Sequence, residues 1–461
     1  MRAFRPLLND SRDKAALVVD YIEKRAGLLI GQREKKGERQ FTFPHRTFQE
    51  FLAACYLAVQ EDFAAQCLRL AREAPGHWQV VLPLAARIAK AERGASAADE
   101  LIGGISIADF RKECQPNTTD WTCALLAGMQ LQEIGVGAIK KTGRTRAIGA
   151  RVADWIAASL PVHPDDGGAP AQQRAYAGDT LARLGDLRFD PERFYLPADY
   201  MLGFVHIPAD SDFRIGTRKA DSKRVAKIIG SQVDDDEIND ELTPTPEFYI
   251  ARFPVTVAQF RAFVEAKGFE IGDADALRDP DSRPVRYVSW HEALAYCEWL
   301  NEIFATSGEL TGTAIARRVR EQGWRVTLPN ELEWEKAARG GLVNKVFPWG
   351  DTPDPNRANY DDSGINDTSA VGCFPANNFG LYDMIGNVWE WTRSHYVSYP
   401  YRVDDGRENL KVTDDVERVV RGGSWDGDLD FARCAYRSRG QPDDRSGHIG
   451  FRVVLRSPPV P

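Results

Sequence analysis

The chain has 461 residues, of which 43% are hydrophobic and 27% charged, an ordinary composition for a globular protein of roughly two to four domains. Its net charge of −8 does not favour a general role in nucleic-acid binding. Its seven cysteines are scattered, with no CxxC and no Cys/His cluster, so neither a disulfide framework nor a structural zinc site is expected.

The N-terminus lacks the basic and then apolar layout of a signal peptide. No apolar run reaches the roughly 18 residues that a membrane-spanning helix needs. We therefore expect a cytoplasmic protein without a membrane partner, an expectation that secretion of the native protein would contradict.

Residues 1–60 are predicted to form a helix, a short strand and a second helix. An apolar helical face covers residues 15–22, and residues 40–43 alternate like a strand. Thr47 can cap the second helix. The run FTFPHRTFQEFLAACYLA resembles the winged-helix-like segment that closes the NACHT class of signalling NTPases. The chain has no GxxxxGK[ST] sequence, so the resemblance implies a remnant of such a module, and an NTPase-type signalling partner, without ATP hydrolysis.

Residues 61–195 are predicted to be an all-α region, because apolar residues recur at spacings of three and four without strand-like alternation. No constellation of chemically active residues stands out there, so we interpret it as a helical platform or spacer. The expected helices are Ala64–Arg72, Val80–Ala91, Ala97–Leu101, Leu125–Ile134, Val152–Ser159 and Arg174–Leu184.

From residue 196 onward, aromatic residues, glycines, prolines and short strand patterns dominate. Three helices are predicted to begin after the N-caps Thr256, Ser289 and Asn330. The acidic stretch DDDEINDE at 234–241 is interpreted as a solvated insertion. Its acids lack the fixed spacing and the turn glycine of a calcium-binding loop.

Nine motifs follow one another in this region: FVHIPA, FRIGT, FYIARFPVTVAQFRAFV, PVRYVSWHEALAYCEWLN, WRVTLPNELEWEKAARGG, FPWGD, GLYDMIGNVWEWT, RVVRGGSW and IGFRVV. In this order they resemble the formylglycine-generating-enzyme-like (sulfatase-modifying factor) domain. The resemblance implies a C-type-lectin-type fold with a small twisted mixed sheet, two helices and long ordered loops. The predicted class is therefore α+β, with this domain at 196–461 preceded by the all-α region.

Enzymatic members of that family oxidise a substrate cysteine with two active-site cysteines that follow the GGS-aromatic motif. In this chain Gly427 stands at the first of those positions, and no cysteine lies near the second. Cys434 occupies neither position. The His-x₃-His-x-Glu iron motif of the related sulfoxide synthases is also missing. We therefore expect a protein that is not an enzyme and binds no copper.

In the same family the GNVWEW turn binds calcium through main-chain carbonyls and a glutamate. Mapped onto this chain, the resemblance implies a structural Ca²⁺ site, since oxygen ligands on irregular backbone suit a hard cation. An alternative stays open, in which the acidic members of the set only accept hydrogen bonds from loop amides. The implied ligands are Asn359, Asp383, Gly386, Val388 and Glu390.

Residues 419–454 carry a second resemblance, through the pattern RGGSW…R-x-A-x-R-x-R…P-x-x-R-x₃-IGFRVV. It is similar to the C-terminal variable region of diversity-generating-retroelement proteins, lectin-fold proteins whose ligand-binding residues are mutated in bulk. The arginines of the pattern would pin the loops through carbonyls or aspartates. The implied ligand-binding positions are Asp426, Gly427, Asp428, Asp430, Phe431, Tyr436, Ser438, Gly440, Ser446, Gly447 and His448.

These resemblances imply a non-catalytic variable protein that displays residues 426–448 to a macromolecular ligand, more a protein surface than a sugar. Two alternatives remain open. One is an enzyme of the same family with chemistry that needs no cysteine pair, using acid–base groups from Asp426, Asp443, Asp444 and His448. The other is the recognition arm of a NACHT-type signalling or defence system, an argument from domain context alone.

Overall fold

The computed structural model describes residues 30–35, 38–42, 46–94, 96–97, 100–101, 118–134, 143–411 and 416–458. The helix predicted at 15–22 lies outside these residues, and the one predicted at Ala97–Leu101 lies partly outside them. The chain divides into two compact units, residues 1–107 with 129–135, and residues 108–128 with 136–461. Within the described part of the chain, no helix is both long and apolar enough to cross a membrane.

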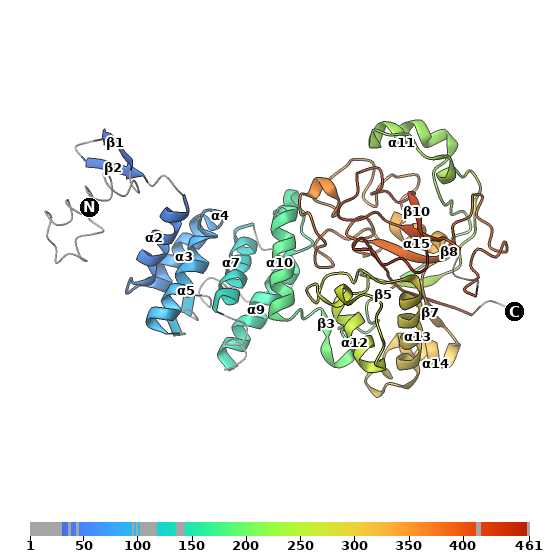
Figure 1. Ribbon diagram of the computed structural model, residues 1–461, viewed down its shortest axis with the longest axis horizontal. Coiled ribbons are helices and arrows are strands. Elements are labelled where there is room, and N and C mark those ends of the chain that lie inside the picture. Colours follow the sequence, from blue (N-terminus) through green and yellow to red (C-terminus); the bar gives the residue numbers. More distant parts are fainter. Residues whose placement is uncertain are drawn as a thin grey trace. The chain divides into compact units, whose positions relative to one another are not determined.

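The first unit opens with an antiparallel pair of strands and continues with short helices (Figure 1). Helix α2 packs against α5 and buries Ala54, Leu57 and Ala58, as an apolar helical face does. The helices predicted at Ala64–Arg72 and Val80–Ala91 are confirmed as α3 and α5. The elements are β1 (Ile30–Lys35), β2 (Glu38–Thr42), α2 (Arg46–Ala58), α3 (Phe63–Glu73), α4 (Pro75–Trp78) and α5 (Val81–Arg93).

Three longer helices follow, α7 (Thr118–Ile134), α9 (Gly143–Ser159) and α10 (Ala171–Leu184), and each contains a predicted helix. Helix α10 is fixed to the C-terminal domain. Arg174 donates to the carbonyls of Cys373 (2.8 Å) and Asn356 (2.6 Å). Asp179 accepts two hydrogen bonds from the Arg283 guanidinium, at 2.9 and 2.8 Å. The domain boundary predicted at residue 196 thus falls inside the second compact unit.

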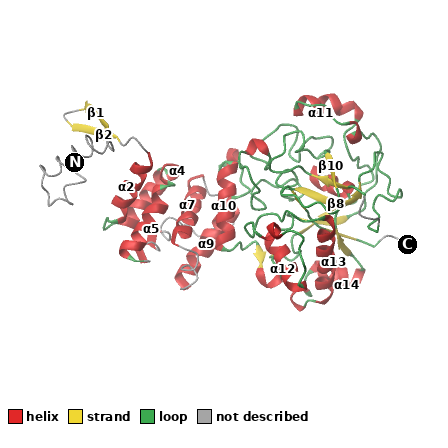
Figure 2. Cartoon of the chain, viewed as in Figure 1, coloured by secondary structure: helices red, strands yellow, loops and turns green. Residues whose placement is uncertain are grey.

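Two four-stranded sheets form the centre of the C-terminal domain, and Figure 2 shows that loops make up most of what surrounds them. In the first, with order β5-β6-β12-β7, all neighbours are antiparallel. In the second, β10-β9-β8-β11, the last pair is parallel. The strands are β5 (Phe204–Ile207), β6 (Phe248–Ala251), β7 (Arg325–Thr327), β8 (Trp389–His395), β9 (Arg418–Arg421), β10 (Arg437–Gly440), β11 (Ile449–Gly450) and β12 (Val454–Arg456), beside a small pair β3 (Phe189–Asp190) and β4 (Leu196–Pro197).

The predicted N-caps of the domain are confirmed. Thr256, Ser289 and Asn330 each accept the backbone N–H three residues later, and the side chain at that later position closes a capping box. The mixed α+β architecture is as predicted, with five α-helices among the described residues of this domain where the resemblance implied two. These are α11 (Ser222–Ile229), α12 (Val257–Lys267), α13 (Trp290–Thr306), α14 (Ala314–Gln322) and α15 (Glu331–Arg339).

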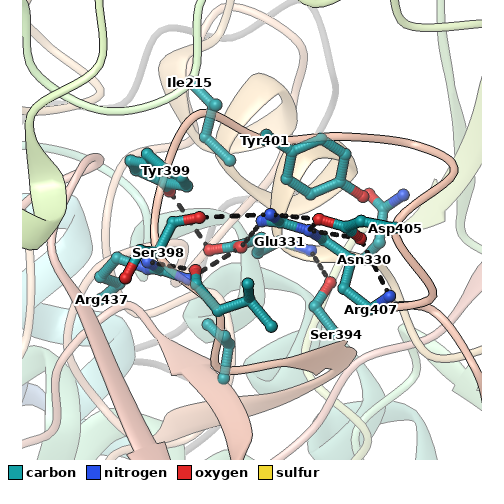
Figure 3. Close-up of polar contacts among 12 residues, drawn as sticks. Ile215, Asn330, Glu331, Ser394, Ser398, Tyr399, Tyr401, Asp405, Arg407 and Arg437 are labelled. Carbon is teal, nitrogen blue, oxygen red and sulfur yellow. Dashed lines mark hydrogen bonds and ion pairs between the residues drawn. The ribbon is translucent and has the colours of Figure 1, made fainter.

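Helix α15 ties the second sheet together through buried ion pairs. Its three glutamates, Glu331, Glu333 and Glu335, are at most 2% exposed, and each contacts an arginine. Figure 3 shows Glu331, which accepts from Arg437 (2.9 Å) and Arg407 (3.3 Å). Buried charges are tolerated only when they are paired and hydrogen-bonded, so this helix and the strands fix one another's positions.

Candidate functional site

The segment 419–454 leaves strand β9 through a turn that requires glycine. Gly422 and Gly423 have φ values of +101° and +79°, in the region that other residues avoid. A Cβ at Gly422 would lie 3.1 Å from the Trp334 ring and 3.2 Å from the carbonyl oxygen of Met384. The turn therefore seats the segment directly on helix α15 and on the loop before strand β8.

Four arginines of the segment hold it in place and donate to backbone carbonyls, as predicted, but the carboxylates that they contact belong to glutamates rather than aspartates. Each guanidinium contacts a carboxylate that is at most 6% exposed at its side chain. Guanidinium–carboxylate pairs combine charge with fixed geometry, so they define where the loops run. The pairs are Arg433–Glu237 (2.7 Å), Arg437–Glu331 (2.9 Å), Arg445–Glu292 (3.0 Å) and Arg452–Glu390 (2.6 Å).

The acidic stretch 234–241 is therefore not simply a solvated insertion, and that interpretation is corrected. Glu237 is fully buried against Arg433, and Asn239 is 4% exposed and donates to the carbonyl oxygen of Ile215. The remaining acids at the start of the stretch are exposed or half-buried. Glu237, one carboxylate of this acidic stretch, therefore anchors the 419–454 segment through its ion pair with Arg433.

The eleven predicted ligand-binding positions differ in exposure. Asp426 and Asp428 are exposed, and Gly427 and Gly440 are buried. A Cβ at Gly440 would lie 2.7 Å from the Trp391 ring, so this position has no room for a side chain, whereas Gly427 has ordinary contact distances of 3.4 Å or more. The other seven are half-buried: Asp430, Phe431, Tyr436, Ser438, Ser446, Gly447 and His448.

Five half-buried rings form what we call the aromatic surface: Trp389, Trp425, Phe431, Tyr436 and His448. Ring centroids of Phe431 and Tyr436 lie 5.1 Å apart, and those of Trp389 and Tyr436 lie 5.8 Å apart. Trp425 lies 5.5 Å from His448. Rigid, partly exposed rings supply large contact areas at low entropic cost, which is why such residues dominate binding surfaces.

Trp389 was not among the predicted positions. It lies at the start of strand β8, where it pairs with Ile449 of β11 and is half-buried, while Trp391 two residues later is fully buried. Both residues belong to the motif GNVWEW. The motif by itself does not indicate that Trp389 is half-buried and Trp391 fully buried. Only the pairing of β8 with β11 brings Trp389 beside the 426–448 loops.

His448 and Asp426 are in contact, with Nδ1 of the imidazole 3.1 Å from Oδ1 of the carboxylate. Ser424 Oγ donates to the same Oδ1 at 2.7 Å, so its proton is directed to Asp426 and not to the imidazole. The three residues therefore do not form a nucleophilic triad, in which the base contacts the hydroxyl. Asp444 accepts a hydrogen bond from the backbone N–H of Gln441 (2.8 Å), which stabilises the turn after β10.

Cys434, the cysteine of this segment, is fully buried beside Met384 and Ile385. Burial raises the pKa of its thiol to about 12, so it is protonated at neutral pH. The cysteines within the described residues are all free. The segment therefore offers no thiol pair and no accessible thiolate.

Side-chain oxygens of the predicted calcium ligands accept hydrogen bonds from protein groups in the structure. Both oxygens of Glu390 are occupied by Arg452, at 2.6 and 2.7 Å, and Trp334 Nε1 also donates to it at 2.6 Å. Asn359 Oδ1 accepts from Ser363 Oγ at 2.9 Å. Asp383 Oδ2 accepts from a backbone N–H at 2.7 Å. An ion at this turn would have to compete with Arg452 for Glu390 and take its other oxygens from main-chain carbonyls, so the calcium site stays a prediction. Among the described residues, no cluster of three His, Cys, Asp or Glu side chains could hold a metal.

Residues 216–457 match the family model of the sulfatase-modifying factor enzyme 1-like domain. The chain is 33% identical over 266 residues to inactive C-alpha-formylglycine-generating enzyme 2 of Bos taurus, covering 53% of this chain and 73% of that protein. It is 32% identical over 199 residues to the formylglycine-generating enzyme of Mus musculus, covering 40% of this chain and 47% of that enzyme, about half its length. Among solved structures, Treponema denticola variable protein 1 is similar, with 22% identity, a TM-score of 0.39, and coverage of 55% of this chain and 94% of that one.

Proposed function

Because the chain belongs to the sulfatase-modifying factor enzyme 1-like family, which has members named as active enzymes and as inactive ones, we propose that it is a non-catalytic binding protein. One observation carries the proposal. The position of the first catalytic cysteine is Gly427, and Cys434, the cysteine that follows it, is buried with a thiol pKa of about 12. A thiol that stays protonated and inaccessible cannot support the oxidation of a substrate cysteine.

The binding region in this proposal is the aromatic surface with the acids beside it. Asp426 and Asp428 are exposed, and Asp430 is half-buried. The half-exposed rings provide anchors, while small and acidic side chains around them adapt to the ligand. Because these rings and acids are spread over one half-exposed face of several loops, its ligand in our proposal is the surface of a macromolecule.

The finer proposal is that the chain is a diversity-generating-retroelement variable protein. It is supported by the alternation of fixed and replaceable positions along 419–454, in which buried arginines are interleaved with half-exposed side chains. The DNA beside the 3′ end of the gene tests this directly. A near-identical template repeat that differs at adenines, next to a reverse-transcriptase gene, is expected; without such a cassette this finer proposal fails and the binding-protein proposal remains.

The absence of catalysis is tested by assaying the full chain for oxidation of a cysteine-containing peptide in the presence of copper and oxygen. We expect no turnover above a protein-free control. A Cys434→Ser variant serves as the matched control, since any reaction that depends on the Cys434 thiol should disappear in it. Turnover that persists in this variant would contradict the proposal and favour chemistry that needs no cysteine.

The display role is tested by substitution. We expect Asp428→Ala, Phe431→Ser and His448→Asn to leave the free energy of unfolding within about 1 kcal/mol of the parent, because their side chains face solvent on one side. Arg433→Met, in the same loop but buried, is the matched comparison and should cost several times more. If the three surface variants unfold the protein, their side chains are part of the core and are not available for display.

A further inference from the structure

A cleft of about 270 Å³ lies between helix α15 and the loop that follows strand β5, and its residues are not part of the 426–448 surface. Its apolar walls come from Pro208, Phe213, Leu342 and Phe379. Pockets for drug-sized molecules occupy roughly 300–1,000 Å³, so this cleft suits a ligand with a single ring or a short aliphatic body.

Lys336 of α15 lines the cleft and is only 5% exposed. Its ammonium donates to the carbonyl oxygen of Pro208, and no described carboxylate lies within ion-pair distance of it. An ammonium has three N–H donors, so this contact leaves two for another acceptor. Burial lowers the pKa of Lys336 from its ordinary value, and the negative charge of Asp210, which also lines the cleft, offsets only part of this effect.

Lys336 differs in this respect from the other charged residues of its helix. Glu331, Glu333, Glu335 and Arg339 all have a partner of opposite charge within 3.3 Å. A buried ammonium with no carboxylate at ion-pair distance is costly, so an anion that reached Lys336 would stabilise it.

A second cation, Arg214, also lines the cleft and is half-buried. It donates to the carbonyl oxygen of Asp240 at 3.1 Å and has no described carboxylate at ion-pair distance. Two acids line the cleft as well. Asp212 is exposed to solvent, and Oδ1 of Asp210 accepts from the backbone N–H of Asp212 at 2.9 Å. The buried cationic end of the cleft therefore belongs to Lys336.

We propose that this cleft binds a small amphiphilic carboxylate, whose anionic group accepts hydrogen bonds from Lys336 and whose apolar body packs against Phe213 and Phe379. Charge-assisted hydrogen bonds are about twice as strong as neutral ones and strengthen further away from water. The two aromatic walls match a flat ring or a branched aliphatic chain. The site is independent of the surface that displays residues 426–448.

Titration calorimetry of the full chain with benzoate tests the proposal, with benzamide as the neutral isostere. We expect benzoate to bind one site per chain and benzamide to bind at least about tenfold more weakly, the loss of one charged hydrogen bond. Lys336→Met should weaken benzoate binding by at least the same factor. Lys345→Met is the matched control, because Lys345 is exposed and paired with Asp351, and it should bind benzoate like the parent.

The Lys336→Met variant is expected to fold, since it replaces a buried ammonium by an apolar side chain of similar length, and its melting temperature should equal or exceed that of the parent. If this variant does not fold, the difference between the parent's affinities for benzoate and for benzamide decides whether the proposal holds. The proposal is overturned if the parent binds neither compound at millimolar concentration, if both bind equally, or if Lys336→Met binds benzoate as the parent does.

Discussion

Arg433 and Glu237 lie 196 residues apart in the chain and form a two-bond ion pair, with each terminal nitrogen of the guanidinium 2.7 Å from one carboxylate oxygen. Both side chains are at most 2% exposed. The pair joins the acidic stretch 234–241 to the loop between strands β9 and β10. The 419–454 segment is thus anchored by a residue that a solvated insertion would not provide.

Removing either member of this pair leaves the other as an uncompensated buried charge. We therefore expect Arg433→Met and Glu237→Gln each to lower the free energy of unfolding by about 3–5 kcal/mol, and the double variant to cost less than the sum. Urea denaturation of the four proteins measures this. Arg439 and Glu417, paired at 3.3 Å on the surface, are the matched control, and their variants should cost no more than about 1 kcal/mol. Equal costs for the two pairs would contradict the anchoring role of Arg433.

Glu390 provides a test between an ion pair and a calcium site. Because Arg452 occupies both of its oxygens, Glu390→Gln should destabilise the protein by about 3–5 kcal/mol, whether calcium is present or not. Melting temperatures in calcium chloride and in EGTA measure this, and we expect the parent to melt at the same temperature in both. A rise of the parent's melting temperature in calcium that Glu390→Gln abolishes would support the predicted calcium site.

Asp383 predicts a dependence of stability on pH. Burial raises the pKa of this carboxyl from 3.8 to about 6, so between these values the folded protein binds more protons than the unfolded chain. Stability should therefore fall as pH rises from about 4 to 6, by about 3 kcal/mol from this group. Asp383→Asn should remove this fall, since asparagine accepts from the same backbone N–H and tolerates the φ of 53°.

Urea denaturation of Asp383→Asn and of the parent at several pH values between 4 and 7 measures the effect, with Asp404→Asn, an exposed aspartate, as control. The stability difference between Asp383→Asn and the parent should grow as pH rises, and the Asp404→Asn difference should stay constant. A difference for Asp383→Asn that does not change with pH would show that this carboxyl is ionised throughout the range.

The sequence was sufficient where the determining interactions are local or where many motifs occur in order. The caps Thr256, Ser289 and Asn330 were predictable because a capping box involves residues only three positions apart. The ordered motifs predicted the family and the α+β class. The structural role of the arginines in 419–454 followed from the number of donors that a guanidinium offers in a polar loop.

Long-range partners were not predictable in the same way. A run of acids such as 234–241 has the composition of a solvated loop, and nothing local shows that Glu237 meets Arg433. On helix α10, Arg174 contacts backbone carbonyls, which every residue has, so its role carries no distinguishing signal in the sequence. Trp389 becomes a surface residue only through the pairing of β8 with β11.

Alanine substitutions at Gly440 and Gly427 test which of the predicted ligand-binding positions can accept a side chain. Neither has a positive φ, so alanine at either position adds no strain of the left-handed kind to the backbone. A Cβ at Gly440 would lie 2.7 Å from the Trp391 ring, whose Nε1 donates to the carbonyl of Val288 at 3.0 Å and whose side chain is fully buried. Gly440→Ala should therefore cost about 1–3 kcal/mol in urea denaturation, and Gly427→Ala about 0.5 kcal/mol or less. If Gly440→Ala is as stable as the parent, the indole can move aside, and Gly440 returns to the set of positions available for display.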